Sequence, residues 1–170
     1  TPLIGMSQPG LATFEPAFAD ELAAIMAWGF DYMQRDDDGG SVYLRLSTRT
    51  IDQPKRDMTP DLSADIIAGA YWLRRPTAST QTVIAYAGTV APEALDAMRQ
   101  LDAAGGDCAL LAITSYDRLH AGWNAATRAR RNGNTHTTSH IENLLAPLSR
   151  DCSIVTVLDG HPATLAWLGS

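Results

Sequence analysis

Residues 82–106 constrain the fold most, because their pattern is typical of a strand, a tight glycine turn and a helix. The first part, residues 82–87, is mostly apolar with β-branched and aromatic side chains, as in a strand covered on both faces. Gly88 permits a sharp turn, and Thr89 is expected to cap the helix that follows. A second strand is predicted at residues 108–114, so this region indicates half of a doubly wound α/β layer.

Composition narrows the class of protein. The chain has 170 residues and a net charge of −6, so nucleic acid and anionic membranes are not expected as its main partners. A domain of this length buries roughly 70% of its unfolded surface, which permits a substantial core. Cys108 and Cys152 fall in predicted buried strands and indicate a reducing compartment, the cytoplasm. No stretch approaches the roughly 20 apolar residues of a membrane-spanning helix.

Residues 1–50 are expected to form one unit. Residues 1–16 are rich in glycine and proline and predict a loop, and an apolar stripe over residues 16–34 predicts a helix. The alternating pattern of residues 41–47 predicts a strand. Residues 51–60 combine prolines with charged side chains and predict a linker between two units.

Residues 61–170 are expected to form a second unit around the two central strands. Ser139 and Glu142 have the spacing of a capping box at a helix start. The other predicted segments are a helix at 62–68, an extended stretch at 71–73, a helix at 116–131, a helix at 140–148 that contains Pro147, a buried strand at 152–158 and a corner at 159–162 before a truncated helix. Because the chain starts with Thr1 and ends within an apolar pattern, we expect it to be a piece of a longer protein.

Two residues are candidate substrate contacts. His161 follows a predicted strand, at the edge where open α/β sheets bind ligands. Alternatively, it is a polar corner residue that accepts hydrogen bonds from helix N–H groups. Arg49 lies just after a strand and before the linker, where a cation can pair with a substrate anion or with a partner subunit. Arg45 lies on the same strand, and its role stays open.

The other motifs give no complete catalytic set. His136 and His140 have zinc-ligand spacing, but Ser139 is expected to start a helix between them, so no metal site is predicted. Ser115 lacks the flanking glycines of a nucleophile elbow, and the Gly88 turn lacks the spacing of a phosphate loop. The arginines of the sequence TRARR are interpreted as a solvated helix end.

Two longer segments resemble a known family. They are TSYDRLHAGW (114–123) and VLDGHPATLAWLG (157–169), and they follow a helix, the strand VYLRLSTR and a proline-containing linker. This order is similar to the carboxyl-terminal part of the transketolase superfamily. It looks closest to the homodimeric decarboxylating component of pyruvate dehydrogenase complexes and its transketolase-like relatives.

The resemblance implies an α/β fold with three layers, αβα. Residues 61–170 would be a Rossmann-like transketolase carboxyl-terminal domain, truncated at its end. Residues 1–50 would be the last helix and strand of a thiamine pyrimidine-binding domain. The resemblance also implies a homodimer, docking to a lipoyl-bearing acyltransferase core, and a small 2-oxo acid substrate, with pyruvate as the first candidate.

The cofactor implied by the resemblance is thiamine diphosphate with magnesium, bound between two subunits. The Gly-Asp-Gly motif and paired Asn that hold the diphosphate in the family are absent from this sequence. The glutamate that activates the cofactor is expected upstream. The resemblance therefore implies the cofactor for a longer parent enzyme, and no catalytic, cofactor-binding or metal-binding residue is expected in this chain.

Two positions bear on the reaction that the resemblance implies. Transketolases carry an arginine in a Ser-Arg-Gln motif that contacts the substrate phosphate; here the sequence is STRT at 47–50, and Arg49 is the candidate match. Glu21 stands where the dehydrogenases carry a glutamate, whereas Ala27 stands where they tend to have a histidine. The alternatives are a transketolase that acts on sugar phosphates and a non-catalytic module of the same fold.

Overall fold

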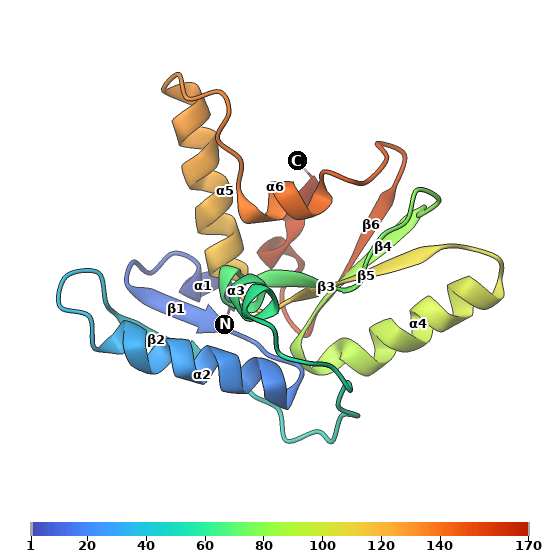
Figure 1. The fold of residues 1–170 in the computed structure, drawn as a ribbon, viewed down its shortest axis with the longest axis horizontal. Helices are drawn as coiled ribbons and strands as arrows, with labels where there is room; N and C mark the ends of the chain where they lie inside the picture. The colour runs from blue at the N-terminus through green and yellow to red at the C-terminus, as the bar shows by residue number, and fades with distance from the viewer. Residues whose placement is uncertain (1, 170) are drawn as a thin grey trace.

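Two sheets of unequal size organise the structure, a computed structural model that describes residues 2–169 (Figure 1). The smaller sheet pairs β1 (Leu11–Phe14) in parallel with β2 (Ser41–Leu44). The larger sheet has the strand order β3-β5-β4-β6. Its strands are β3 (Ala70–Arg74), β4 (Thr82–Ala87), β5 (Cys108–Ile113) and β6 (Ser153–Val157).

Helices connect and cover these strands. They are α1 (Pro2–Gly5), α2 (Ala19–Met33), α3 (Pro60–Ala68), α4 (Ala91–Ala103), α5 (Tyr116–Arg131) and α6 (His140–Leu145). Short 3-10 turns follow β4 and β6: η1 (Gly88–Val90), η2 (Pro162–Thr164) and η3 (Ala166–Gly169). α4 and α5 each start within a few residues of a strand end, as in doubly wound α/β folds.

The two central strands pair in parallel, as predicted. Thr82 lies opposite Cys108, and Ala87 lies opposite Ile113. Because successive side chains of a strand point to opposite faces, each strand contributes to two cores. One face packs with residues of α2, α3 and α4, and the other packs with residues of α5 and α6. The predicted three-layer α/β arrangement is confirmed.

The first sixteen residues differ from the prediction of a loop. Their described part contains α1 and β1, so the prediction is wrong for this segment. Phe14 is buried in the core between the two sheets, and the backbone N–H of Thr13 donates to Asp117 on α5 at 3.1 Å. β1 has only four residues and pairs with a strand beyond α2, so the local sequence pattern is too short to reveal it.

The predicted buried strand at 152–158 is β6, which lies at an edge of the large sheet. Val155 is 49% exposed, and Cys152 is half-buried, so the prediction that this strand and its cysteine are buried is wrong. Cys108, in the central strand β5, is buried as predicted. An apolar run does not distinguish a central strand from an edge strand, because that depends on which strands pair in three dimensions.

The local helix signals have mixed outcomes. The Ser139 hydroxyl accepts the N–H of Glu142, and the Glu142 carboxylate accepts the N–H of Ser139, so the capping box is confirmed. α6 ends at Leu145, before Pro147. Thr89 does not cap α4, because it lies in η1, which continues directly into α4; that prediction is wrong.

Candidate functional site

The carboxyl ends of strands from both sheets meet at one place. Glu15 follows β1, Arg45 follows β2, and Asp159 lies just beyond β6. They border a cavity of about 310 Å³, here called the strand-end cleft. Its lining residues are Glu15, Pro16, Arg45, Leu46, Ser47, Thr48, Thr89 and Asp159. Open α/β sheets bind their ligands at this edge, so the cleft is the candidate functional site.

Glu15 occupies the inner end of the cleft. Its side chain is 4% exposed, and its carboxylate accepts hydrogen bonds from Arg45 Nη1 at 2.6 Å and from the Tyr116 hydroxyl at 3.1 Å. Burial raises the pKa of Glu15 above its ordinary value of 4.5, and the Arg45 charge opposes that effect only in part. The Glu15 N–H donates to the carbonyl of Thr114 at 2.8 Å, which holds this residue at the end of β5.

Arg45 joins the two sheets across the cleft. Besides Glu15, it donates to the Asp159 carboxylate at 2.7 Å and to the Asp159 carbonyl at 2.6 Å. Asp159 is largely exposed, with 63% of its side chain accessible. Two carboxylates therefore share one guanidinium, and the cluster carries a net negative charge when both are ionised.

The turn after β4 fits against Glu15 because it contains a glycine. Gly88 has a φ of +60°, in the left-handed region that favours glycine. A Cβ atom at this position would lie 2.6 Å from Cγ of Glu15. The glycine that the sequence marks as a turn is therefore also the residue that lets the backbone approach the buried carboxylate.

The predicted site residues lie beside the cleft. Arg49 pairs with Glu93 at 2.7 Å and donates to the carbonyl of Thr89, a cleft residue, at 3.2 Å. His161 is exposed, and its Nδ1 accepts the N–H of Ala163 at 3.2 Å, the contact of a polar corner residue. His161 is not among the residues that line the cleft. Substrate binding by either residue stays a prediction.

The residues that the structure brings together most closely, Glu15, Arg45, Tyr116 and Asp159, are not evident as a cluster from the sequence. Glu15 follows a strand that the sequence pattern did not reveal, so its position at a strand end was hidden. Asp159 was recognised only as part of a corner, and Tyr116 only as the start of a helix. A charged residue directly after a buried strand is a usable signal, but it requires that the strand be recognised first.

Residues 2–169, which the structure describes, include His, Cys, Asp and Glu side chains of the kinds that bind metal ions. No group of three or more His, Cys, Asp or Glu side chains is placed to hold a metal ion there. His140 lies on α6 with its Nε2 2.7 Å from the carbonyl of Ala70. Among the same residues, no helix has the length and apolar character to cross a membrane.

Comparison with solved structures shows which proteins share this fold. No protein-family model matches the chain, and no curated protein matches its sequence. A transketolase from Leishmania mexicana superposes with a TM-score of 0.66 and 16% identity, covering 97% of this chain and 20% of that one. The chain has a transketolase-type fold.

Two further structures agree with this transketolase-type fold. A Pichia stipitis transketolase in complex with fructose 6-phosphate gives a TM-score of 0.62 at 15% identity and covers 97% of this chain and 20% of that one. A split-gene transketolase, in an inactive tetramer, gives 0.54 at 18% identity and covers 99% and 55%. The chain thus spans about a fifth of the length of the full transketolases that it matches.

Proposed function

We propose that this chain is the carboxyl-terminal part of a thiamine diphosphate-dependent enzyme of the transketolase superfamily. The observation that carries this proposal is the transketolase-type fold, which extends over 97% of the chain and corresponds to 20% of a complete transketolase. The chain includes elements of two units, so it contributes a strand-end cleft as well as a helix-covered sheet. It would also serve dimerisation, and docking of a lipoyl-bearing acyltransferase core.

The parent enzyme supplies the cofactor site. Thiamine diphosphate provides a stabilised carbanion when bound, and the protein contributes positioning and electrostatics. The Gly-Asp-Gly motif of the family is absent from this sequence, so we assign this chain no chemical step at the cofactor. The contribution of this chain is one negatively charged side of the strand-end cleft, where Arg45 bridges Glu15 and Asp159.

We further propose that the reaction is decarboxylation of a 2-oxo acid, with pyruvate as the first candidate. The charge of the cleft supports this choice. A sugar phosphate carries a phosphate dianion, and the cleft offers it a guanidinium already shared by two carboxylates. Arg49, the candidate phosphate contact, is itself paired with Glu93. Pyruvate is smaller, carries one negative charge and needs fewer cationic partners.

Transfer of a two-carbon unit between sugar phosphates is the second candidate. It is favoured by the solved structures, which are transketolases and include one with fructose 6-phosphate. Both members of the Arg49–Glu93 pair are exposed, and exposed ion pairs add little to stability, so a phosphate would displace Glu93 at little cost. A non-catalytic module is the third candidate, favoured by the inactive tetramer of the split-gene transketolase.

An assay of the intact parent enzyme separates these candidates. The enzyme is supplied with thiamine diphosphate and magnesium and offered either pyruvate with an electron acceptor or a sugar-phosphate pair. We expect turnover of pyruvate, lowered in Arg45→Gln and unchanged in Arg75→Gln, a control at an exposed arginine outside the cleft. Turnover of sugar phosphates alone would contradict the 2-oxo acid proposal, and turnover of neither would favour the module.

A further inference from the structure

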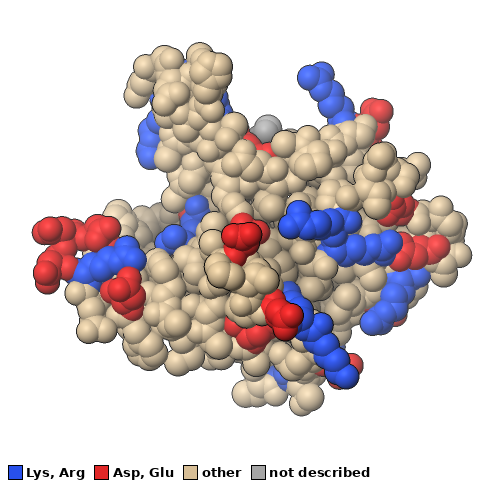
Figure 2. Space-filling view, viewed as in Figure 1, with Lys and Arg blue, Asp and Glu red and all other residues tan. Residues whose placement is uncertain are grey.

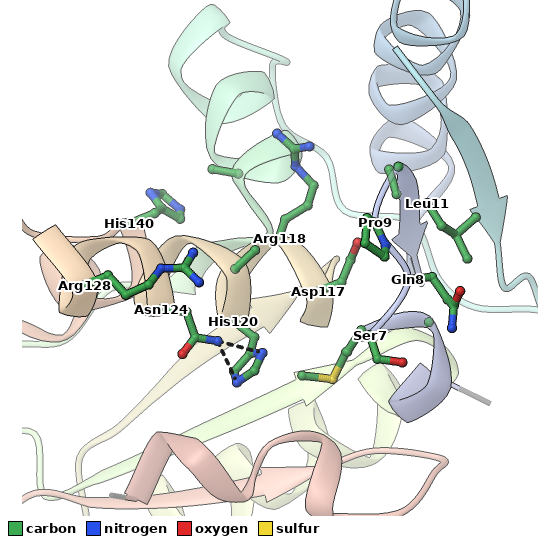
Figure 3. A pocket seen from close by; sticks show the side chains of 16 residues that line it. Ser7, Gln8, Pro9, Leu11, Asp117, Arg118, His120, Asn124, Arg128 and His140 are labelled. Atoms are coloured by element: carbon green, nitrogen blue, oxygen red, sulfur yellow. Dashed lines mark hydrogen bonds between the residues drawn. The ribbon is translucent and has the colours of Figure 1, made fainter. Parts of the chain in front are cut away.

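We propose a second ligand site, separate from the strand-end cleft, that binds a small phosphorylated molecule. It is a cavity of about 790 Å³ between α5 and the turn that joins α1 to β1 (Figure 3). This volume lies within the roughly 300–1,000 Å³ of small-molecule sites in proteins. The cavity is on the α5 side of β1, and it shares no lining residue with the strand-end cleft.

One face of α5 forms the polar wall of this cavity. His120, Asn124 and Arg128 are spaced four residues apart, so they lie on the same side of the helix. Figure 3 shows the Asn124 amide and the His120 ring next to each other, with Ser7 and Gln8 on the opposite wall. These side chains supply hydrogen-bond donors of three kinds: guanidinium, amide and imidazole.

The histidine is held in a fixed position at this wall. Its ring nitrogens lie 3.2 and 3.3 Å from the Asn124 side-chain nitrogen. The ring packs against Trp123 and Trp167, with centroid distances of 6.1 and 5.3 Å. A pre-positioned polar group loses little freedom when a ligand binds, which favours binding over a mobile surface contact.

The cavity is positively charged in a chain whose net charge is −6. Figure 2 shows basic and acidic side chains interspersed over one face of the molecule, and many arginines there have acidic neighbours. By contrast, neither Arg118 nor Arg128 forms an ion pair with another described residue. Arg128 is exposed to the cavity side of α5. An anion is the ligand that the exposed guanidinium of Arg128 binds best.

Among the described residues, Asp117 is the one carboxylate that lines the cavity, and it offsets one of the two arginine charges, which leaves Arg128 as the guanidinium available to a ligand. Asp117 accepts hydrogen bonds from the backbone N–H and the hydroxyl of Thr13, at 3.1 and 2.8 Å, and from the Ser115 hydroxyl. Arg118 stacks over Trp28 at 4.6 Å and donates to the carbonyl of Ile67, and burial lowers its pKa. Arg118 is therefore engaged by the protein itself, and Arg128 is the guanidinium that remains for an anion.

The chemistry of the wall indicates a phosphate ester. The wall presents more hydrogen-bond donors than the two oxygens of a carboxylate can accept. A phosphate ester has three terminal oxygens and can accept from more of them. The cavity is larger than inorganic phosphate needs, and Met6, Leu11 and Ala121 give it apolar surface for the rest of the ligand. We therefore assign the phosphate group to Arg128 and Asn124, with His120 beside them.

Calorimetric titration of the intact protein with glucose 6-phosphate and with inorganic phosphate tests this site. We expect both to bind, the ester more tightly, and we expect Arg128→Gln to weaken binding about tenfold or more, as loss of a charge-assisted hydrogen bond does. Arg131→Gln, an exposed arginine of the same helix outside the cavity, is the matched control and should leave affinity unchanged.

Three outcomes would overturn the proposal: no binding of either probe, equal affinity in Arg128→Gln and wild type, or an equal loss in Arg131→Gln. Circular dichroism of each variant ensures that a loss of binding does not reflect unfolding. Arg45→Gln in the strand-end cleft should not change phosphate binding. That result distinguishes this site from the proposed function, because the turnover assay uses the cleft and the titration does not.

Discussion

Two buried glutamates with the same kinds of partner have different surroundings. Glu15 and Glu21 are 3% and 1% exposed, and each carboxylate contacts a tyrosine hydroxyl and lies near an arginine. Glu15 lines the strand-end cleft, and its arginine reaches on to the exposed Asp159. Glu21 lies under the start of α2, where it accepts the backbone N–H groups of Ala17 and Phe18 at 2.6 and 3.0 Å.

The cluster around Glu21 fastens the linker to the rest of the protein. Arg56, within the predicted linker, pairs with Asp20 at 2.7 Å and donates to the Tyr71 hydroxyl at 2.8 Å. Tyr71 donates in turn to Glu21. Together these contacts join α2, the linker and β3. The difference between the two glutamates lies in their neighbours. Glu15 lines a cleft and its arginine also contacts an exposed residue, so Glu15 is a candidate site residue. Glu21 is surrounded by the residues that it bonds, so its role is structural.

Removing the carboxylate of Glu21 is expected to have the largest effect on stability. Glu21→Ala leaves two backbone N–H groups and the Tyr71 hydroxyl without their acceptor, and it removes the 3.8 Å ion contact with Arg56, which keeps Asp20 as its partner. We expect a loss of about 3–5 kcal/mol in the free energy of unfolding, measured by urea denaturation. Glu93→Ala, at an exposed ion pair, is the control and should cost much less, because exposed ion pairs add little to stability. Equal losses of stability in the two variants would contradict a structural role for the buried Glu21.

Adding a methyl group at the cleft is expected to have the next largest effect. Gly88→Ala combines a left-handed backbone with a Cβ that would overlap Glu15, so we expect a loss of about 2–4 kcal/mol. Gly105→Ala is the matched control. Gly105 also has a positive φ, of +83°, but a Cβ there meets nothing within 4 Å, so the loss should be about 1 kcal/mol. Identical thermal unfolding curves for the two variants would show that the approach to Glu15 is unimportant.

Some of these features can be predicted from the sequence alone, and others cannot. The parallel pair β4–β5, the Gly88 turn and the Ser139 cap depend on contiguous residues, so local patterns predict them. β1 and the edge position of β6 depend on pairing between distant segments, which a single sequence does not report. Glu15 cannot be predicted as a site residue unless β1 is known. Its neighbours Arg45, Tyr116 and Asp159 come from three other parts of the chain.

Neutralising the cleft carboxylate is expected to change stability less, and in a pH-dependent way. Burial raises the pKa of Glu15, so the folded state binds its proton more tightly than the unfolded chain does. The wild-type protein therefore loses stability as the pH rises through the window above the ordinary value of 4.5, and Glu15→Gln does not share that loss. Urea denaturation at pH 4 and pH 7 should show that the free energy of unfolding of Glu15→Gln, relative to that of wild type, is higher at pH 7 than at pH 4. A difference that is constant with pH would contradict the raised pKa.

The smallest effect is expected at the predicted substrate contact. Arg49→Gln removes an exposed ion pair with Glu93, so the free energy of unfolding should stay close to that of wild type. Turnover of pyruvate by the parent enzyme should be unchanged if the substrate carries no phosphate. A selective rise in KM for a sugar phosphate would instead support the transketolase alternative and the phosphate contact by Arg49.

The most direct test of the account is the steady-state turnover of pyruvate by the intact parent enzyme carrying Glu15→Gln. The account places Glu15 in the wall of the functional cleft, so it predicts that kcat/KM falls about tenfold or more. It also predicts that the urea midpoint of this variant stays near that of wild type, unlike that of Glu21→Ala. Full turnover in Glu15→Gln, with an undisturbed fold, would contradict the assignment of the strand-end cleft as the functional site.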